Sequence, residues 1–106
     1  MFSFHSIKDY HAQLLHGSTT CVEAVQYYLK QIDSQSHLNA FLEVYAEEAI
    51  QLASVLDEQR TQKGITGKLH GVVIGIKDVI CYKNHHVSAA SKILEGFVSL
   101  YNATAV

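Results

Sequence analysis

The chain has 106 residues, of which 48% are hydrophobic and 17% are charged, and its formal net charge is -2 at pH 7. This composition excludes an intrinsically disordered chain, and the scattering of its eight Lys and Arg residues excludes the basic face of a nucleic-acid binder. No stretch approaches the ~20 apolar residues of a membrane span, and the start lacks the basic residues of a signal peptide, which predicts a cytoplasmic protein.

The first 38 residues predict a helical scaffold that begins with a short helix. Ser6 followed three residues later by Asp9 resembles a capping box, in which a hydroxyl accepts a hydrogen bond from a backbone N–H of the first helical turn. Gly17 is expected to end this helix, because glycine adopts the left-handed conformation of a C-terminal cap without strain.

A second, longer helix is predicted to begin at Thr20, because Glu23 follows it at the spacing of another capping box. Apolar residues recur along this helix at the spacing of one helical face, which predicts that they are buried. These residues are Val22, Val25, Leu29 and Ile32.

Residues 39–106 predict the start of a sheet. Residues 40–45 are rich in strand formers, and residues 46–62 carry small and apolar side chains on one helical face. Residues 72–77 follow as a second strand, and a strand, helix and strand in this order form a right-handed crossover that pairs the strands in parallel. The predicted fold class is therefore α/β, with N-terminal helices followed by a strand-helix-strand unit.

Lys77 ends the nearly unbroken apolar run Gly71-Val72-Val73-Ile74-Gly75-Ile76-Lys77-Asp78. Such a run is typical of a strand buried on both faces, and a lysine there is hard to explain by packing. Because side chains alternate along a strand, Lys77 and Asp78 are expected on opposite faces and need not pair. The alternative interpretation is a lysine that has just left the core and points into solvent.

The cysteines and histidines do not predict a site. Cys21 and Cys81 stand at no pairing or metal-binding spacing, so we expect reduced structural thiols. His85 and His86 are adjacent in a polar loop, but no further Cys or His stands at ligand spacing from them. We therefore expect no metal site in this chain.

Three segments, residues 67–80, 88–97 and 101–106, carry a recognisable pattern, and shorter segments at 20–24, 38–42 and 46–49 extend it upstream. With these segments the chain resembles the amidase signature family, and within it most closely the A subunits of glutamyl-tRNA(Gln) amidotransferases. The resemblance implies that residues 1–106 are the N-terminal portion of an amidase-signature domain with a mixed sheet. It also implies that Lys77 is the lysine of a Ser, cis-Ser, Lys catalytic triad.

The same resemblance implies that the two catalytic serines lie downstream of the matching region. Ser88 and Ser91 match a loop and short helix after the lysine strand, so neither is expected to be a nucleophile, and these 106 residues alone are expected to be inactive. The family usually has proline, asparagine and aspartate where this chain has Val73, Val79 and Asn102.

Partners and substrates are likewise implied by the resemblance. Glutamine would supply ammonia to a B subunit, which would use ATP and magnesium to convert misacylated Glu-tRNA(Gln), and a small C subunit would help to hold the two together. This segment would bind no cofactor and would meet tRNA only through its partner. Two alternatives stay open: a free-standing amidase acting on small amides, and a non-catalytic association module. Unpaired strand edges would favour self-association.

Overall fold

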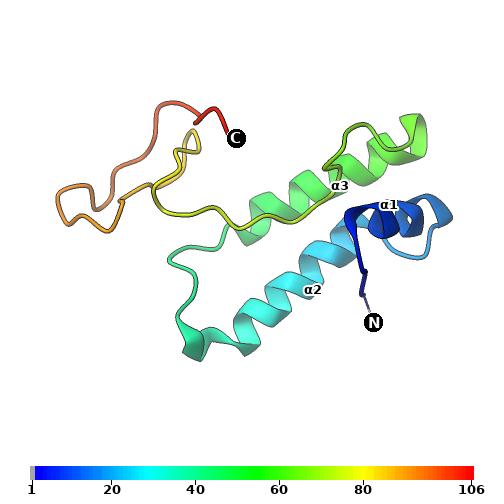
Figure 1. Ribbon diagram of the computed structural model, residues 1–106, viewed down its shortest axis with the longest axis horizontal. Coiled ribbons are helices and arrows are strands. Elements are labelled where there is room, and N and C mark those ends of the chain that lie inside the picture. The colour runs from blue at the N-terminus through cyan, green and yellow to red at the C-terminus, as the bar shows by residue number, and fades with distance from the viewer. Residues whose placement is uncertain (1) are drawn as a thin grey trace. The chain divides into compact units, whose positions relative to one another are not determined.

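The chain divides into two compact units, Met1–Val73 and Ile74–Val106, and the computed structural model describes residues 2–106. Within residues 2–73, three α-helices and one turn of 3-10 helix form (Figure 1). They are α1 (Ile7–His16), α2 (Cys21–Ser34), η1 (Ser36–Leu38) and α3 (Ala46–Lys63). The third helix thus belongs to the same unit as the two helices of the predicted scaffold.

Both ends of α1 are capped as the sequence predicts. The Ser6 hydroxyl accepts a hydrogen bond of 3.0 Å from the Asp9 N–H. Gly17 adopts the left-handed conformation with φ 76°, and its N–H donates to the Leu14 carbonyl at 3.2 Å. The N–H of Ser18 reaches the Gln13 carbonyl at 3.0 Å, so two carbonyls at the end of the helix are satisfied.

Helix α2 begins at the predicted cap, where the Thr20 hydroxyl accepts from the Glu23 N–H at 3.1 Å. The predicted apolar face is confirmed in part: Val25 is buried, and Val22 and Leu29 pack partly against the core. Cys21 and Ala24, which were not predicted, are more deeply buried, and Ile32 is only partly buried.

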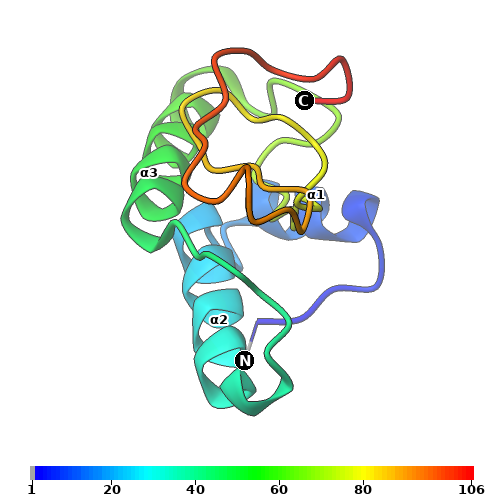
Figure 2. The ribbon, with the colours of Figure 1, turned by 90° about the vertical axis from the view of Figure 1, so that its left-hand side faces the viewer.

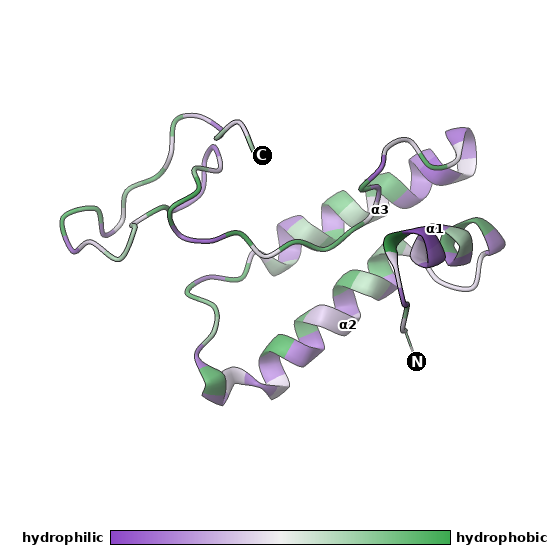
Figure 3. Cartoon of the chain, viewed as in Figure 1, coloured by the Kyte–Doolittle hydropathy of each residue, from purple (hydrophilic) through white to green (hydrophobic). Residues whose placement is uncertain are grey.

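Helix α3 is the neighbour of α2: it runs alongside α2 in Figure 1 and lies above it in Figure 2. Ala53 of α3 is buried beside the α2 residues, and Ala49, Ile50 and Leu56 pack partly against the same core. Figure 3 shows apolar residues spread along both helices. The predicted helix is therefore present, and its small-residue face packs on α2.

The predicted strands are the main correction to the fold. Among residues 2–106 no strand forms, and neither 40–45 nor 72–77 pairs with another segment. Ile74 is 61% exposed and Ile76 is 44% exposed, so the apolar run is not buried on both faces. Two parallel strands are stable only when other elements cover both faces of their sheet. Here α3 packs on α2 instead.

The second unit consists of turns that are closed by one short antiparallel contact. His86 and Val98 form an isolated bridge, and the Val87 N–H donates to the Phe97 carbonyl at 3.1 Å. The N–H of Ser99 donates to the His85 carbonyl at 3.0 Å, and the Ser99 side chain is fully buried. The predicted short helix is not formed, since residues 88–97 consist of turns.

Candidate functional site

Lys77, the predicted catalytic residue, lies on the surface of the second unit. Its side chain is exposed, and no ion pair joins it to any carboxylate among residues 2–106. The Lys77 carbonyl accepts a hydrogen bond of 2.9 Å from the Ile80 N–H, so a turn begins at this residue. Within the second unit, Lys77 therefore matches the solvent-facing interpretation rather than the buried strand.

Asp78, the next residue, is bound by a loop ten to twelve positions along the chain. Its carboxylate accepts hydrogen bonds from the Ser88 N–H at 2.8 Å, from the Ser88 hydroxyl, and from the Ala90 N–H at 3.3 Å. These hydrogen bonds, first that of the Ser88 hydroxyl, favour the charged form and lower the pKa of Asp78 below its ordinary value. The carboxylate is therefore engaged by the loop and forms no ion pair with Lys77.

The two serines near Lys77 have structural hydrogen bonds in this unit. Ser88 directs its hydroxyl at Asp78, as described above. The N–H of Ser91 donates to the Ser88 carbonyl at 2.8 Å, which closes a turn. These contacts stabilise the loop, and the assignment of both serines as non-nucleophiles stays a prediction.

Gly71, at the start of the apolar run, is held in the first unit by a buried contact. The Tyr10 hydroxyl donates to the Gly71 carbonyl at 2.8 Å. Gly71 has φ 72°, and a Cβ placed on it would lie 2.5 Å from the Cys21 sulfur and 2.9 Å from the Tyr10 oxygen. Only glycine fits here, because both the backbone conformation and the available space exclude a side chain.

The polar groups beside Gly71 are shielded from water. Burial raises the pKa of the Cys21 thiol to about 11, and the hydrogen bond and charge of Asp57 act in the same direction. Burial also raises the pKa of the Tyr10 hydroxyl. Both groups therefore stay protonated at neutral pH, which suits structural roles better than nucleophilic ones.

A small apolar cavity lies next to this contact, with a volume of about 20 Å³. Its lining comprises Phe2, Phe4, Tyr10, Ala24, Tyr28, Gly71, Val72 and Val73. A space of this size holds about one water molecule, so it is not a substrate pocket.

Asp57 and Arg60 of α3 bind the start of α2 and the end of α1, and so connect the three helices. The sequence patterns did not predict this role. The Asp57 carboxylate accepts from the N–H groups of Cys21 at 2.8 Å and Val22 at 3.1 Å, where α2 begins. Arg60 donates to the Leu14 carbonyl near the end of α1 at 2.9 Å. The sequence signal for this role was a pair of opposite charges, three residues apart, on a helix face that is otherwise mainly apolar.

Comparison with known families identifies the chain, because the profile of the family described as Amidase matches residues 23–106. The chain belongs to the amidase family. The resemblance noted from the segments around Lys77 is thereby confirmed, and the chain is a part of an amidase-family domain.

Curated relatives extend the likeness to almost the whole chain. A protein of Pelodictyon phaeoclathratiforme is 39% identical over 103 residues, which are 97% of this chain and 22% of that protein. One of Chlorobium chlorochromatii is 40% identical over 95% of this chain and 21% of its own length, and one of Renibacterium salmoninarum is 43% identical over 90% and 18%. Each is named as the A subunit of a glutamyl-tRNA(Gln) amidotransferase. This chain spans about a fifth of the length of these relatives.

No solved structure matches the chain. Over residues 2–106, no three or more His, Cys, Asp and Glu side chains gather where they could hold a metal ion. None of the helices described is long and apolar enough to cross a membrane.

The three positions at which this chain departs from the usual residues of the family, Val73, Val79 and Asn102, lie in different structural surroundings. Asn102 uses its side-chain oxygen to accept from the Lys83 N–H at 2.8 Å, a bond that an aspartate could also accept. Val79 is exposed, and Val73 lines the small cavity of the first unit. At Asn102, then, the acceptor is kept although the charge is lost.

Proposed function

We propose that this chain is the N-terminal portion of a glutamine-dependent amidotransferase subunit that hydrolyses glutamine to supply ammonia. The observation that carries the proposal is the similarity to A subunits, at 39% identity over 97% of the chain and 40% over 95%. The activity named in those relatives concerns glutamyl-tRNA(Gln), so the ammonia would serve the conversion of Glu-tRNA(Gln) to Gln-tRNA(Gln).

Lys77 is proposed as the base of a Ser, cis-Ser, Lys triad whose serines come from sequence outside these 106 residues. The nucleophilic serine would attack the side-chain amide carbon of glutamine, and its proton would pass through the second serine to a neutral Lys77. Breaking the C–N bond and returning the proton to nitrogen would release ammonia and leave an acyl-enzyme, which water would cleave to glutamate.

Asp78 would take no part in this proton transfer, because its carboxylate accepts hydrogen bonds from Ser88 and Ala90. Lys77 is exposed in the described unit, so the rest of the active site would have to supply the surroundings in which a lysine can act as a base.

The remaining parts of the reaction are proposed to lie with other subunits. A B subunit would bind ATP, magnesium and the misacylated tRNA, and a C subunit would help to hold the complex together. All of these components are proposed to meet in the cytoplasm. The 106 residues alone would release no ammonia.

The direct test uses the full-length natural chain that contains these residues, with its B and C partners. Ammonia release from glutamine, and its transfer to Glu-tRNA(Gln) when ATP is present, would support the proposal. Cleavage of small aryl or aliphatic amides with no action on glutamine would favour a free-standing amidase. An absence of both activities would favour the non-catalytic association module.

A further inference from the structure

Three consecutive backbone N–H groups of the second unit are directed at Asp78. Those of Ser88 and Ala90 donate to its carboxylate at 2.8 and 3.3 Å, and that of Ala89 donates to its main-chain carbonyl at 3.0 Å. The N–H groups of Ser88 and Ala90 thus bind an anion, as successive backbone N–H groups do in anion-binding nests, and we call residues 88–90 the nest.

The nest is held in a conformation that its own residues disfavour. Ala89 has φ 49° and Ala90 has φ 59°, so two adjacent alanines are in the left-handed region, where a Cβ approaches the backbone. Neither residue has the freedom of glycine. Strained positions of this kind persist only where the surroundings determine them, and here the hydrogen bonds to Asp78 are the determining contacts.

The backbone that follows Lys77 is also held by hydrogen bonds. Ile80 donates to the Lys77 carbonyl at 2.9 Å, and Ala89 donates to the carbonyl of Asp78. Both peptide groups that follow the Lys77 Cα therefore have fixed hydrogen-bond partners. The Asp78 carboxylate is bound by the nest as well. The backbone conformation just after Lys77 therefore depends on the contacts of Asp78.

We propose that Asp78 is a positioning residue, which uses its carboxylate to hold the backbone of Ser88, Ala89 and Ala90 and thereby sets the place of the Lys77 amine. The inference rests on the proposed function of Lys77 but concerns a different residue. Asp78 itself transfers no proton and touches no substrate.

The test uses Asp78→Ala in the full-length natural chain with its partners, assayed for ammonia release from glutamine. Misplacement of a reacting group by ~1 Å costs roughly 100-fold in rate, and we expect a fall in kcat of about that order with KM for glutamine within a few-fold of wild type. Formate, which supplies the missing carboxylate, should restore most of kcat, whereas chloride at equal ionic strength should not. Glu95→Ala, which removes an exposed charge from the same unit, is the matched control.

Ser88 variants and an activity-independent readout keep the inference testable should Asp78→Ala fold poorly. Ser88→Thr keeps the hydroxyl that binds Asp78 and should retain activity, while Ser88→Ala should reduce it. In hydrogen exchange, the amides of Ser88, Ala89 and Ala90 should exchange faster in Asp78→Ala and slow again with formate. Unchanged exchange, or wild-type kcat in both Asp78→Ala and Ser88→Ala, would overturn the inference. An inactive wild-type enzyme with the expected exchange changes would overturn only the proposed function.

Discussion

Asp57, near the C-terminal end of α3, accepts a hydrogen bond of 2.8 Å from the backbone N–H of Cys21, the first residue of α2. A carboxylate at a helix N-terminus satisfies donors that the helix itself cannot pair, and its charge opposes the positive end of the helix dipole. The contact joins residues 36 positions apart, so it specifies how α3 is placed along α2.

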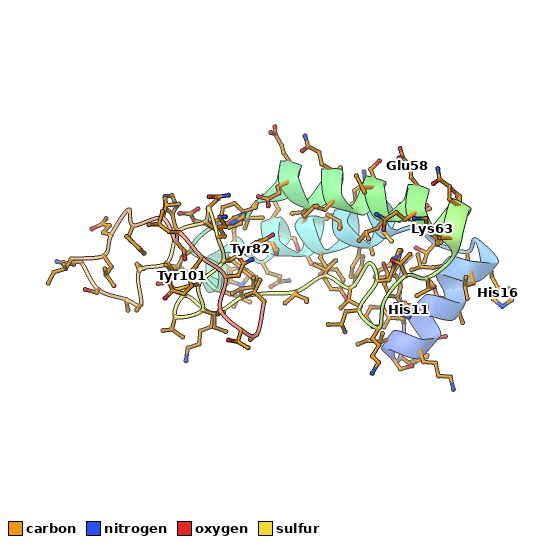
Figure 4. All side chains as sticks on the ribbon, turned by 90° about the horizontal axis from the view of Figure 1, so that it is seen from above. His11, His16, Glu58, Lys63, Tyr82 and Tyr101 are labelled. Carbon is orange, nitrogen blue, oxygen red and sulfur yellow. The ribbon has the colours of Figure 1, made fainter. Side chains whose placement is uncertain are left out.

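Replacing Asp57 by alanine should lower the free energy of unfolding of the 106-residue chain by about 1–2 kcal/mol, the usual cost of losing a helix cap. Chemical denaturation measures the change. Glu58→Ala is the matched control, because Glu58 is exposed and projects from the same helix away from α2 (Figure 4). Equal effects of the two substitutions would contradict a capping role.

Gly71→Ala should destabilise the first unit by about 2 to 4 kcal/mol, from the left-handed backbone and the overlap with the Cys21 sulfur. Gly67→Ala provides the control four residues away, since a Cβ there meets nothing within 4 Å. It should change stability by less than about 0.5 kcal/mol. Urea unfolding curves of the two variants test whether stability requires a residue without a Cβ at position 71.

The buried thiol of Cys21 should make stability fall at alkaline pH. Its pKa is raised from 9.0 to about 11 in the folded chain, so the unfolded chain loses this proton first as the pH rises. The contribution of Cys21 is fully present below pH 9 and is lost between about pH 9 and 11. The free energy of unfolding, measured as a function of pH, should decline less steeply in Cys21→Ala than in the wild type. An unchanged decline would rule out Cys21 as a cause. The Tyr10 hydroxyl, whose pKa is also raised, should account for a remaining decline.

Lys77→Met and Lys77→Arg should both lower glutamine-dependent ammonia release by the full-length natural chain at least 100-fold, because general base catalysis is typically worth ~100 to 10,000-fold. Methionine has no amine, and arginine cannot lose its proton at working pH. Thermal unfolding should change little, since Lys77 is exposed. The same two substitutions at Lys92, also exposed in this unit, serve as controls. An arginine variant at Lys77 within a few-fold of wild type would show that charge rather than basicity matters.

The starts of α1 and α2 were predictable because a hydroxyl and the N–H three residues later are brought together by the first helical turn itself. Ser6 with Asp9 and Thr20 with Glu23 are such pairs, and Gly17 ends α1 for an equally local reason. The likeness to the amidase family was also readable, since it rests on the order of residues along the chain.

The burial of Cys21 and Ala24 in α2, the absence of strands and the surroundings of Asp78 were not predictable in the same way. The apolar run before Lys77 suits a buried strand, but a strand forms only where another segment pairs with it, and here none does among residues 2–106. Helix ends such as the left-handed Gly17 follow from neighbours within a few residues, so local sequence is enough to specify them. The packing of α3 on α2, the cap that Asp57 provides at Cys21, and the binding of Asp78 by Ser88 and Ala90 emerge only when the chain folds, because each of these contacts joins segments ten or more residues apart.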